Sequence, residues 1–201
     1  MAIDERWAEG AIRFLMTKPE KERWKRITDP TERAEFVAEF WRERDPTPET
    51  LENEYRVEIE RRMAFADSRL GEEETKGSET DRGMVFVLMG PPSYAGQQPL
   101  KSADDPIQVA RAAPVQEVVT NPDGSISTRT VQREPLTTER IQGTREAWHY
   151  RRDRLPSTIR FAEVTFVFLT KTGYGVAVLQ RDPDALTALD LATRPARSAS
   201  P

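Results

Sequence analysis

The 201-residue chain lacks cysteine, has a single histidine and contains no long uninterrupted hydrophobic run. Without cysteine it can form neither a disulfide bond nor a thiolate metal site. One histidine cannot supply the clustered imidazoles of a typical zinc centre, so neither a metal nor another cofactor is expected. No stretch approaches the roughly 20 apolar residues that a membrane-spanning helix needs. We therefore expect no transmembrane segment.

The chain also lacks a strong charge of either sign. Its 30 basic and 34 acidic residues nearly cancel, and no basic stripe is evident, which argues against nucleic acid as a partner. Hydrophobic residues make up 37% of the chain, enough for the core of one soluble domain. The first 20 residues contain no apolar secretory core. The protein is expected to be cytoplasmic, or periplasmic or secreted if an export leader has been removed.

What is present up to about residue 70 is helical periodicity, so residues 1–70 are predicted to form an N-terminal helical part. Thr17 and Glu20 have the spacing of a capping box, in which each side chain satisfies the backbone of the other. Asp29 followed by Pro30 marks the start of another helix, which ends by Asp45 because Pro46 disfavours helical geometry in the residue before it.

A further helix is predicted to begin at Thr47 and Pro48 and to present one apolar row, formed by Leu51, Tyr55, Ile59, Met63, Ala66 and Leu70. We expect this helix and the one before it to pack on a sheet through four of their apolar side chains: Trp41, Tyr55, Ile59 and Met63.

Residues 71–182 are predicted to form the sheet part of the same domain. The apolar run at residues 84–89 lies between Gly83 and Gly90 and suits a short buried strand. Further strands are predicted within residues 146–151, 161–169 and 174–180, and the tight connection at residues 170–173 favours a hairpin. The predicted fold class is α+β, with N-terminal helices on a small, mainly antiparallel sheet.

Residues 93–143 are predicted to be a variable insertion of low hydrophobicity. Two runs rich in Val, Ile and Thr, at residues 115–120 and 125–132, are separated by the turn-forming sequence NPDG, which predicts a protruding β-hairpin. Its strand edges could recruit another protein chain. Residues 183–201 are expected to be a C-terminal tail, and the sequence leaves the oligomeric state open.

Four blocks of the chain resemble the bacterial GWxTD domain family. They are FWRERDPTPETLENEYR at residues 40–56, GSETDRGMVFVLMGPP at 77–92, EAWHY at 146–150 and FVFLTKTGYG at 166–175. Gly77, Thr80 and Asp81 match the family's signature, whereas Ser78 stands where the family has its tryptophan. Because the function of the family is uncharacterised, the resemblance implies only a bacterial origin and an envelope or secreted location. It supplies no catalytic residues.

His149 is the most obvious chemical candidate, because it is the only histidine. It is flanked by Trp148 and Tyr150 on a predicted strand, so its side chain alternates in direction with theirs. An acid–base role would require a carboxylate partner such as Asp81 or Asp45. Otherwise His149 is an outward-facing polar residue between core aromatics.

A second set of candidates lies at the boundaries of predicted elements. It consists of Arg44, Asp45, Asn53, Glu54, Asp81 and Arg82, with Trp148 as a further candidate for binding. These residues could line a polar pocket for a small ligand, or they could be structural staples in which caps and ion pairs hold helices against the sheet. The leading functional hypothesis is a non-catalytic binding or protein-interaction module. The alternative is a hydrolase that uses Asp81, Asp45 or Glu54 with His149.

Overall fold

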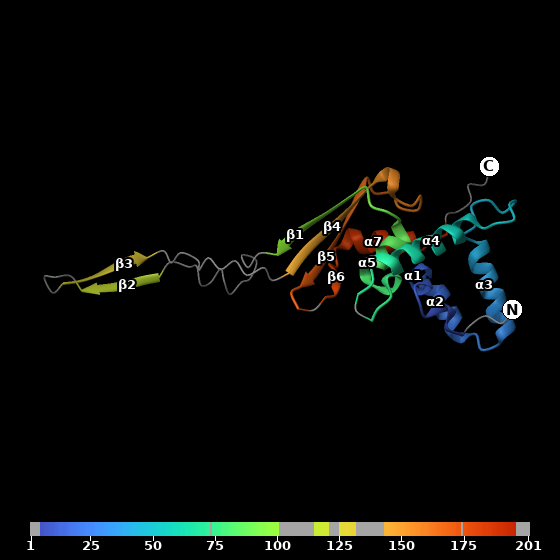
Figure 1. The fold of residues 1–201 in the computed structure, drawn as a ribbon, viewed down its shortest axis with the longest axis horizontal. Helices are drawn as coiled ribbons and strands as arrows, with labels where there is room; N and C mark the ends of the chain where they lie inside the picture. The colour runs from blue at the N-terminus through green and yellow to red at the C-terminus, as the bar shows by residue number, and fades with distance from the viewer. Residues whose placement is uncertain are drawn as a thin grey trace.

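The computed structural model describes residues 5–72, 74–100, 115–120, 125–131, 143–173 and 175–195. They form an α+β fold, as the sequence predicts, with helices gathered at one side of a four-stranded antiparallel sheet (Figure 1). The N-terminal helical part consists of η1 (Glu5–Ala8), α1 (Ile12–Leu15), α2 (Lys18–Arg26), α3 (Pro30–Arg42) and α4 (Glu54–Arg69).

The predicted caps of α2 and α3 are confirmed. The Thr17 hydroxyl accepts a hydrogen bond from the Glu20 backbone, and the Glu20 carboxylate accepts one from the Thr17 backbone at 2.6 Å. The Asp29 carboxylate accepts hydrogen bonds from the first turn of α3. Aromatic side chains fill the space between these helices, where the Trp7 ring lies 5.3 Å from the ring of Phe40.

The start of α4 differs from the prediction. Residues 47–50 form a turn, and the helix begins at Glu54 with Asn53 as its N-cap. Leu51 lies before the helix and is fully exposed to solvent, so it does not belong to the apolar row. Thr47 and Pro48 resemble a helix start, but Asn53 satisfies the backbone of the first turn and therefore determines where α4 begins.

The sheet has the strand order β1-β4-β5-β6, and every neighbouring pair is antiparallel. Its strands are β1 (Tyr94–Leu100), β4 (Gly143–Arg151), β5 (Glu163–Lys171) and β6 (Ala177–Leu179). The predicted hairpin of the last two strands is confirmed. β1 was not predicted as a strand, because its sequence YAGQQPL has little apolar character.

The prediction of a strand at residues 84–89 is wrong. These residues belong to α5 (Asp81–Met89), which begins after the N-cap Thr80 and ends at Gly90, whose φ of 77° breaks the helix. The run is apolar on all sides because the helix is buried on all sides. Phe86 stacks on Phe65 of α4 at 4.8 Å between ring centroids and meets Trp148 of β4 edge-on at 6.5 Å.

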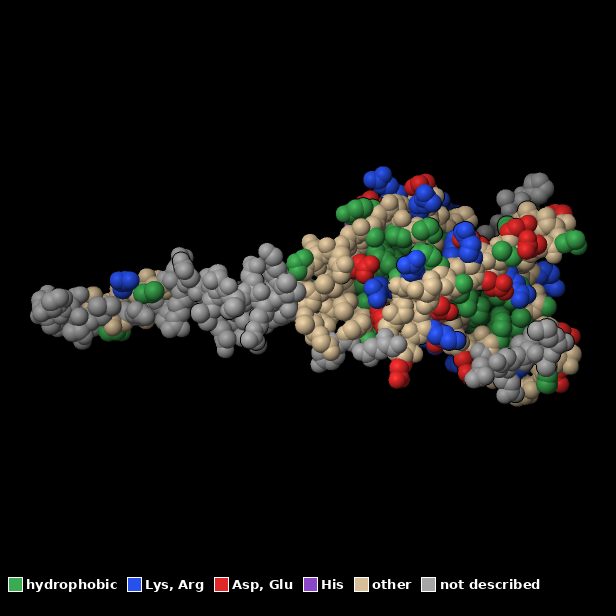
Figure 2. Space-filling model, in the orientation of Figure 1, with side chains coloured by type: hydrophobic (Ala, Val, Ile, Leu, Met, Phe, Trp, Pro, Cys, Tyr) green, Lys and Arg blue, Asp and Glu red, His purple; other side chains and the backbone are tan. Residues whose placement is uncertain are grey.

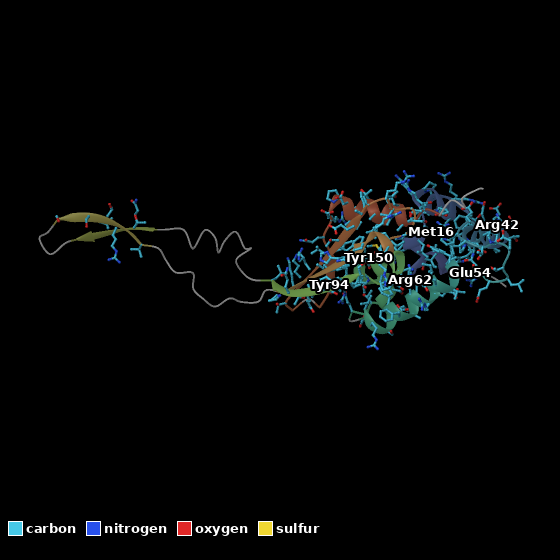
Figure 3. All side chains as sticks on the ribbon, turned by 90° about the horizontal axis from the view of Figure 1, so that it is seen from above. Met16, Arg42, Glu54, Arg62, Tyr94 and Tyr150 are labelled. Atoms are coloured by element: carbon cyan, nitrogen blue, oxygen red, sulfur yellow. The ribbon has the colours of Figure 1, made fainter. Side chains whose placement is uncertain are left out.

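The layering therefore also differs from the expectation that the third and fourth helices pack directly on the sheet. α5 packs against β6 and α4 packs against α5, so α5 lies between α4 and the sheet. Arg62 of α4 and Tyr150 of β4, both labelled in Figure 3, each form a hydrogen bond with the end of α5. The Arg62 guanidinium donates to the carbonyl of Val87, and the Tyr150 hydroxyl donates to the carbonyl of Gly90 at 2.9 Å.

The predicted C-terminal tail contains a helix, α7 (Pro183–Ala192), which packs on β5. Asp182 caps it, and one face enters the core through four buried residues: Ala185, Ala188, Leu189 and Ala192. The assignment of residues 183–192 to a tail is therefore wrong, because apolar residues at helical spacing follow an Asp-Pro start. The predicted tail from residue 196 onward lies outside the described residues.

The inserted hairpin is confirmed, with β2 (Val115–Thr120) antiparallel to β3 (Ile126–Val131). Its predicted turn, residues 121–124, lies outside the described residues. The hairpin stands apart from the four-stranded sheet, and its two strands pack chiefly on each other. The insertion is shorter than predicted, because β1 and the start of β4 belong to the main sheet, where Leu100 is paired with Gly143.

Basic and acidic side chains are intermingled on the face shown in Figure 2. Within the described ranges, no helix is long and apolar enough to cross a membrane.

Candidate functional site

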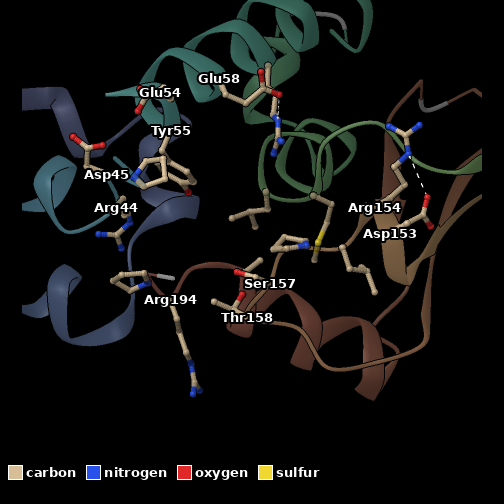
Figure 4. Close-up of a pocket in the computed structure, with 18 residues that line it drawn as sticks. Arg44, Asp45, Glu54, Tyr55, Glu58, Asp153, Arg154, Ser157, Thr158 and Arg194 are labelled. Carbon is tan, nitrogen blue, oxygen red and sulfur yellow. Dashed lines mark hydrogen bonds and ion pairs between the residues drawn. The ribbon is translucent and has the colours of Figure 1, made fainter. Parts of the chain in front are cut away.

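Three of the predicted site residues line one cleft of about 440 Å³ (Figure 4). The N-terminal half of α4 forms one wall, and the loop that contains residues 153–158 forms the opposite wall. Leu88 and Met89, at the end of α5, form part of the lining, and the end of α7 contributes Ala192. Arg44, Asp45 and Glu54 lie at the side where α3 leads into α4.

Arg44 is a structural residue at the edge of this cleft. Its side chain is 2% exposed and forms an ion pair with Glu20 at 2.8 Å. Its guanidinium lies 3.8 Å from the centre of the Phe40 ring and donates to the carbonyls of Leu15 and Thr193. A buried arginine needs this many acceptors to offset the loss of hydration. Arg44 therefore joins the N-terminal helices to the end of α7.

Asp45, Asn53 and Glu54 organise the connection between α3 and α4. The Asp45 carboxylate accepts a hydrogen bond from the Thr47 backbone at 3.0 Å, and Asn53 both caps α4 and donates to the Trp41 carbonyl at 2.7 Å. Glu54 accepts hydrogen bonds from the hydroxyls of Thr47 and Thr50. The hydrogen bond from Thr47 is the largest cause that lowers the pKa of Glu54, followed by its own backbone and Thr50.

Three further residues of α4 line the cleft and were not singled out as site residues from the sequence: Tyr55, Glu58 and Arg62. Arg62 forms an ion pair with Glu58 at 2.7 Å. Burial alone would raise the pKa of Glu58, but the hydrogen bond and charge of Arg62 hold it below its usual value. Tyr55 is largely buried, and this burial raises the pKa of its hydroxyl. The tyrosine therefore remains protonated at neutral pH and can donate a hydrogen bond.

The opposite wall contributes two hydroxyl groups, those of Ser157 and Thr158 (Figure 4). The Thr158 hydroxyl oxygen is buried and has no hydrogen-bond partner. Its loop is held in place by Leu155 and Ile159, which enter the core, and by Arg152, which donates to the Ile159 carbonyl. No local sequence pattern marks Ser157 or Thr158, because tertiary packing brings this turn opposite α4.

Asp81, Arg82 and Trp148 lie away from the cleft, where α5 meets the sheet. The Asp81 carboxylate accepts a hydrogen bond from the Leu179 backbone of β6 at 2.8 Å. Arg82 forms ion pairs with Glu72 at 2.8 Å and Glu146 at 3.4 Å. The indole of Trp148 donates to Glu146 at 2.6 Å, and its ring is buried. This arrangement matches the structural alternative, in which polar residues hold α5 against the sheet.

The segment at residues 77–83, called the signature segment below, packs closely on α4. A side chain at Gly77 would meet the Ala66 carbonyl oxygen at 1.8 Å, and one at Gly83 would meet the Gly77 carbonyl oxygen at 1.7 Å. The Thr80 hydroxyl accepts from the Gly83 backbone and donates to the Gly77 carbonyl. The close approach of the backbones therefore requires glycine at positions 77 and 83. The N-cap of α5 accounts for the threonine at position 80.

Ser78 lies in the same segment, at the position where the sequence departs from the GWxTD signature. It is 2% exposed, and its backbone N–H donates to the Asp67 carboxylate of α4 at 2.8 Å.

His149 points away from the core, on the sheet face opposite to the one on which Trp148 and Tyr150 are buried. Its Nδ1 forms a hydrogen bond with the Thr165 hydroxyl at 2.9 Å, and its ring lies 5.8 Å from that of Tyr94. This agrees with the prediction of an outward polar residue between core aromatics.

The four residues named for a hydrolase fall into three separate places. Asp45 and Glu54 line the cleft, Asp81 faces β6, and His149 lies on the outer face of the sheet. Among the described residues there is no cluster of His, Asp and Glu that could hold a metal ion.

Comparison of the chain with protein-family models, curated proteins and solved structures returns no match in any of the three.

Proposed function

We propose that this protein is a non-catalytic interaction module that recruits another protein chain by strand addition to the hairpin β2–β3. The observation that carries the proposal is that this hairpin stands as a two-stranded sheet of its own. A two-stranded hairpin is marginally stable in water unless it packs on a helix or gains another strand. A third strand supplied by a partner would pair with backbone groups at either outer edge.

The side chains of the hairpin are consistent with strand addition. Val118 is 68% exposed, and Gln116, Thr128 and Thr130 are exposed as well. β-Branched residues favour an extended backbone, and their polar neighbours keep an unpaired hairpin in solution. Such a surface suits main-chain pairing along an edge better than burial of one apolar face.

A deletion tests whether the hairpin is needed for partner capture but not for folding of the domain. Leu100 and Gly143 are paired across β1 and β4, so an Asn-Gly turn can replace residues 101–142 and close the two strands directly. We expect this variant to unfold at nearly the same temperature as the full chain. In affinity capture from the native organism, it should lose the protein retained by the full chain.

Two point variants refine the test. Val118→Pro removes one backbone donor from the hairpin, whereas Val118→Thr keeps the donor and the β-branched shape. Capture should be lost with proline and kept with threonine, and the amides of β2 and β3 should become protected from hydrogen exchange only when the partner is present. Capture that is unchanged by the deletion would contradict the proposal.

We further propose that the domain shares its fold with the GWxTD family. Gly77, Thr80 and Asp81, which match the signature of that family, have structural roles in this chain: close packing, helix capping and attachment to β6. A shared signature of this kind would specify a shared fold and no particular reaction. The experimental structure of a family member tests this, because its signature threonine should cap a helix.

The hydrolase alternative has weaker support, because its proposed acid and base lie in separate places. General acid–base catalysis needs both groups within hydrogen-bond reach of one reacting atom.

A further inference from the structure

The two edge strands of the main sheet, β6 and β1, differ in what their free edges offer to another chain. At the edge of β6, the Ala177 N–H donates to the Glu72 carboxylate at 3.1 Å, and the Leu179 N–H donates to the Asp81 carboxylate at 2.8 Å. These carboxylates occupy the backbone donors that an added strand would need. The edge of β6 is therefore closed to strand addition.

The free edge of β1, in contrast, is open. The Ser93 N–H donates to the His149 carbonyl, and the Arg151 N–H donates to the Ser93 hydroxyl, so the odd-numbered residues of β4 direct their backbone groups toward β1. The register pairs them with residues 94, 96, 98 and 100 of β1. Because backbone groups alternate in direction along a strand, the residues between these face outward. They are Ala95, Gln97 and Pro99.

β1 also has few of the features that protect a free edge. Its sequence YAGQQPL contains no charged residue, although charged residues make up 32% of the chain. Natural edge strands are often protected by lysine, by proline or by a covering element. Here Pro99 removes one outward donor near the end of the strand, whereas the outward N–H groups of Ala95 and Gln97 have no partner among the described residues.

There is also room for a further strand beside β1. The helices α5 and α7 pack on β6 and β5, at the other side of the sheet. Ala95, Gln97 and Pro99 are exposed although they lie on the helix side of β1, the side on which Trp148 is buried. The hairpin β2–β3 lies beyond the ends of β1 and β4 and leaves this edge uncovered (Figure 1).

We infer that β1 pairs with β1 of a second copy of this chain, antiparallel about a two-fold axis, so that two four-stranded sheets become one continuous sheet. A two-fold interface places the same strand opposite itself. With Gln97 on the axis, the two Gln97 residues exchange N–H···O bonds, and the Ala95 N–H of each copy donates to the Pro99 carbonyl of the other. All outward N–H groups of both strands are then used.

The side chains that meet in this register suit each other. Tyr94, which is 65% exposed, faces Leu100 of the second copy, and an aromatic side chain beside an aliphatic one is a favourable cross-strand neighbour. The two Gln97 amides can hydrogen-bond to each other, because each has both donors and an acceptor. No like charges meet, because β1 carries none. The strand is therefore complementary to itself.

Analytical ultracentrifugation of the full-length chain over a range of concentrations tests the inference. Pairing along one short strand buries little surface, so we expect a reversible monomer–dimer equilibrium in the micromolar range. Gln97→Lys and Gln97→Glu each place like charges opposite each other at the axis, which should raise the dimer dissociation constant at least roughly fivefold. An equimolar mixture of the two variants should dimerise at least as well as the parent, because opposite charges then meet.

A matched control and a second readout accompany these variants. Val178→Lys adds the same charge to the closed edge strand β6, where Val178 is 56% exposed, and should leave dimerisation unchanged. The amides of Ala95 and Gln97 should exchange hydrogen more slowly as the protein concentration rises. Those of Ala177 and Leu179, which are already bonded to carboxylates, should exchange at a rate that does not depend on concentration.

The inference is independent of partner capture by the hairpin, so Val118→Pro in β2 should leave the dimer intact. A dimer that Val118→Pro dissociates would have the hairpin as its interface and would overturn the inference. A chain that stays monomeric at millimolar concentration would overturn it as well. So would a dimer that survives both charge variants, or a mixture of Gln97→Lys and Gln97→Glu that stays monomeric.

Discussion

The Thr80 hydroxyl in the signature segment and the Thr158 hydroxyl beside the cleft both lie close to the core, but only the first has hydrogen-bond partners. In the signature segment, the Thr80 hydroxyl makes two hydrogen bonds and the Asp81 carboxylate accepts one from β6. In the cleft, the Thr158 hydroxyl is buried without a partner. Polar groups that are satisfied inside the chain contribute to folding, whereas a buried group without a partner carries an uncompensated desolvation cost. The region that the sequence marks most strongly is therefore a structural element.

The largest effect is expected from Gly83→Ala in the signature segment. The new methyl group would lie 1.7 Å from the Gly77 carbonyl oxygen, so the backbones of α5 and the preceding turn would have to separate. We expect a loss of at least about 4 kcal/mol in the free energy of unfolding, or no folding at all. Urea denaturation followed by circular dichroism measures this loss.

Gly71→Ala is the matched control for that change. An added methyl group there would meet its nearest atom at 3.6 Å, an ordinary contact, so stability should change by no more than about 1 kcal/mol. Equal effects of the two substitutions would show that the signature segment does not depend on close packing.

Thr80→Val should have the next largest effect. It removes the helix cap and leaves two buried backbone groups without their hydrogen bonds, which together should cost about 2 kcal/mol of unfolding free energy. Denaturation with urea measures the loss. Thr187→Val, on the exposed face of α7 where the hydroxyl donates to Pro183, should stay within about 0.5 kcal/mol of the parent.

Asp81→Asn tests whether Asp81 holds α5 against β6. The amide keeps one oxygen acceptor but loses the charge that strengthens the bond to the Leu179 backbone, so a loss of about 1–2 kcal/mol is expected. Hydrogen exchange at Leu179 should also become faster. Unchanged stability would contradict the structural interpretation. Asp153→Asn is the control, because that side chain is 74% exposed.

Thr158→Val should have the smallest effect and the opposite sign to Thr80→Val. Replacing an unpartnered buried hydroxyl with a methyl group removes a desolvation cost, so thermal unfolding should show a gain of up to about 1 kcal/mol. A loss of stability as large as that of Thr80→Val would show that the Thr158 hydroxyl stabilises the fold, as the Thr80 hydroxyl does.

Local capping chemistry was the most predictable part of the fold. The Thr17–Glu20 box and the Asp29 cap need only neighbouring residues, so they could be identified before any tertiary contact was known. Asp182 and Pro183 repeat the pattern of Asp29 and Pro30, and this signal could have revealed α7.

Tertiary packing decided the parts that could not be predicted. A short apolar run such as residues 84–89 suits a buried strand and a buried helix equally well, and only the layers on both sides of α5 distinguish them. The Thr80 cap three residues before Gly83 was the available local signal. Of the residues predicted to share one pocket, Arg44, Asp45 and Glu54 line the cleft, whereas Asp81 and Arg82 lie elsewhere. Ser157 and Thr158 come from a distant turn that no spacing rule connects to α4.

The buried guanidinium of Arg44 has a consequence for synthesis on the ribosome. One of its acceptors, the Thr193 carbonyl, lies 149 residues further along the chain. Translation proceeds at roughly 5–20 residues per second, so the nascent N-terminal helices wait roughly 7–30 seconds before the end of α7 emerges and supplies this acceptor to Arg44. During that interval the Arg44 guanidinium lacks one of the acceptors that offset its loss of hydration, so its burial is completed only after the C-terminal helix has been made.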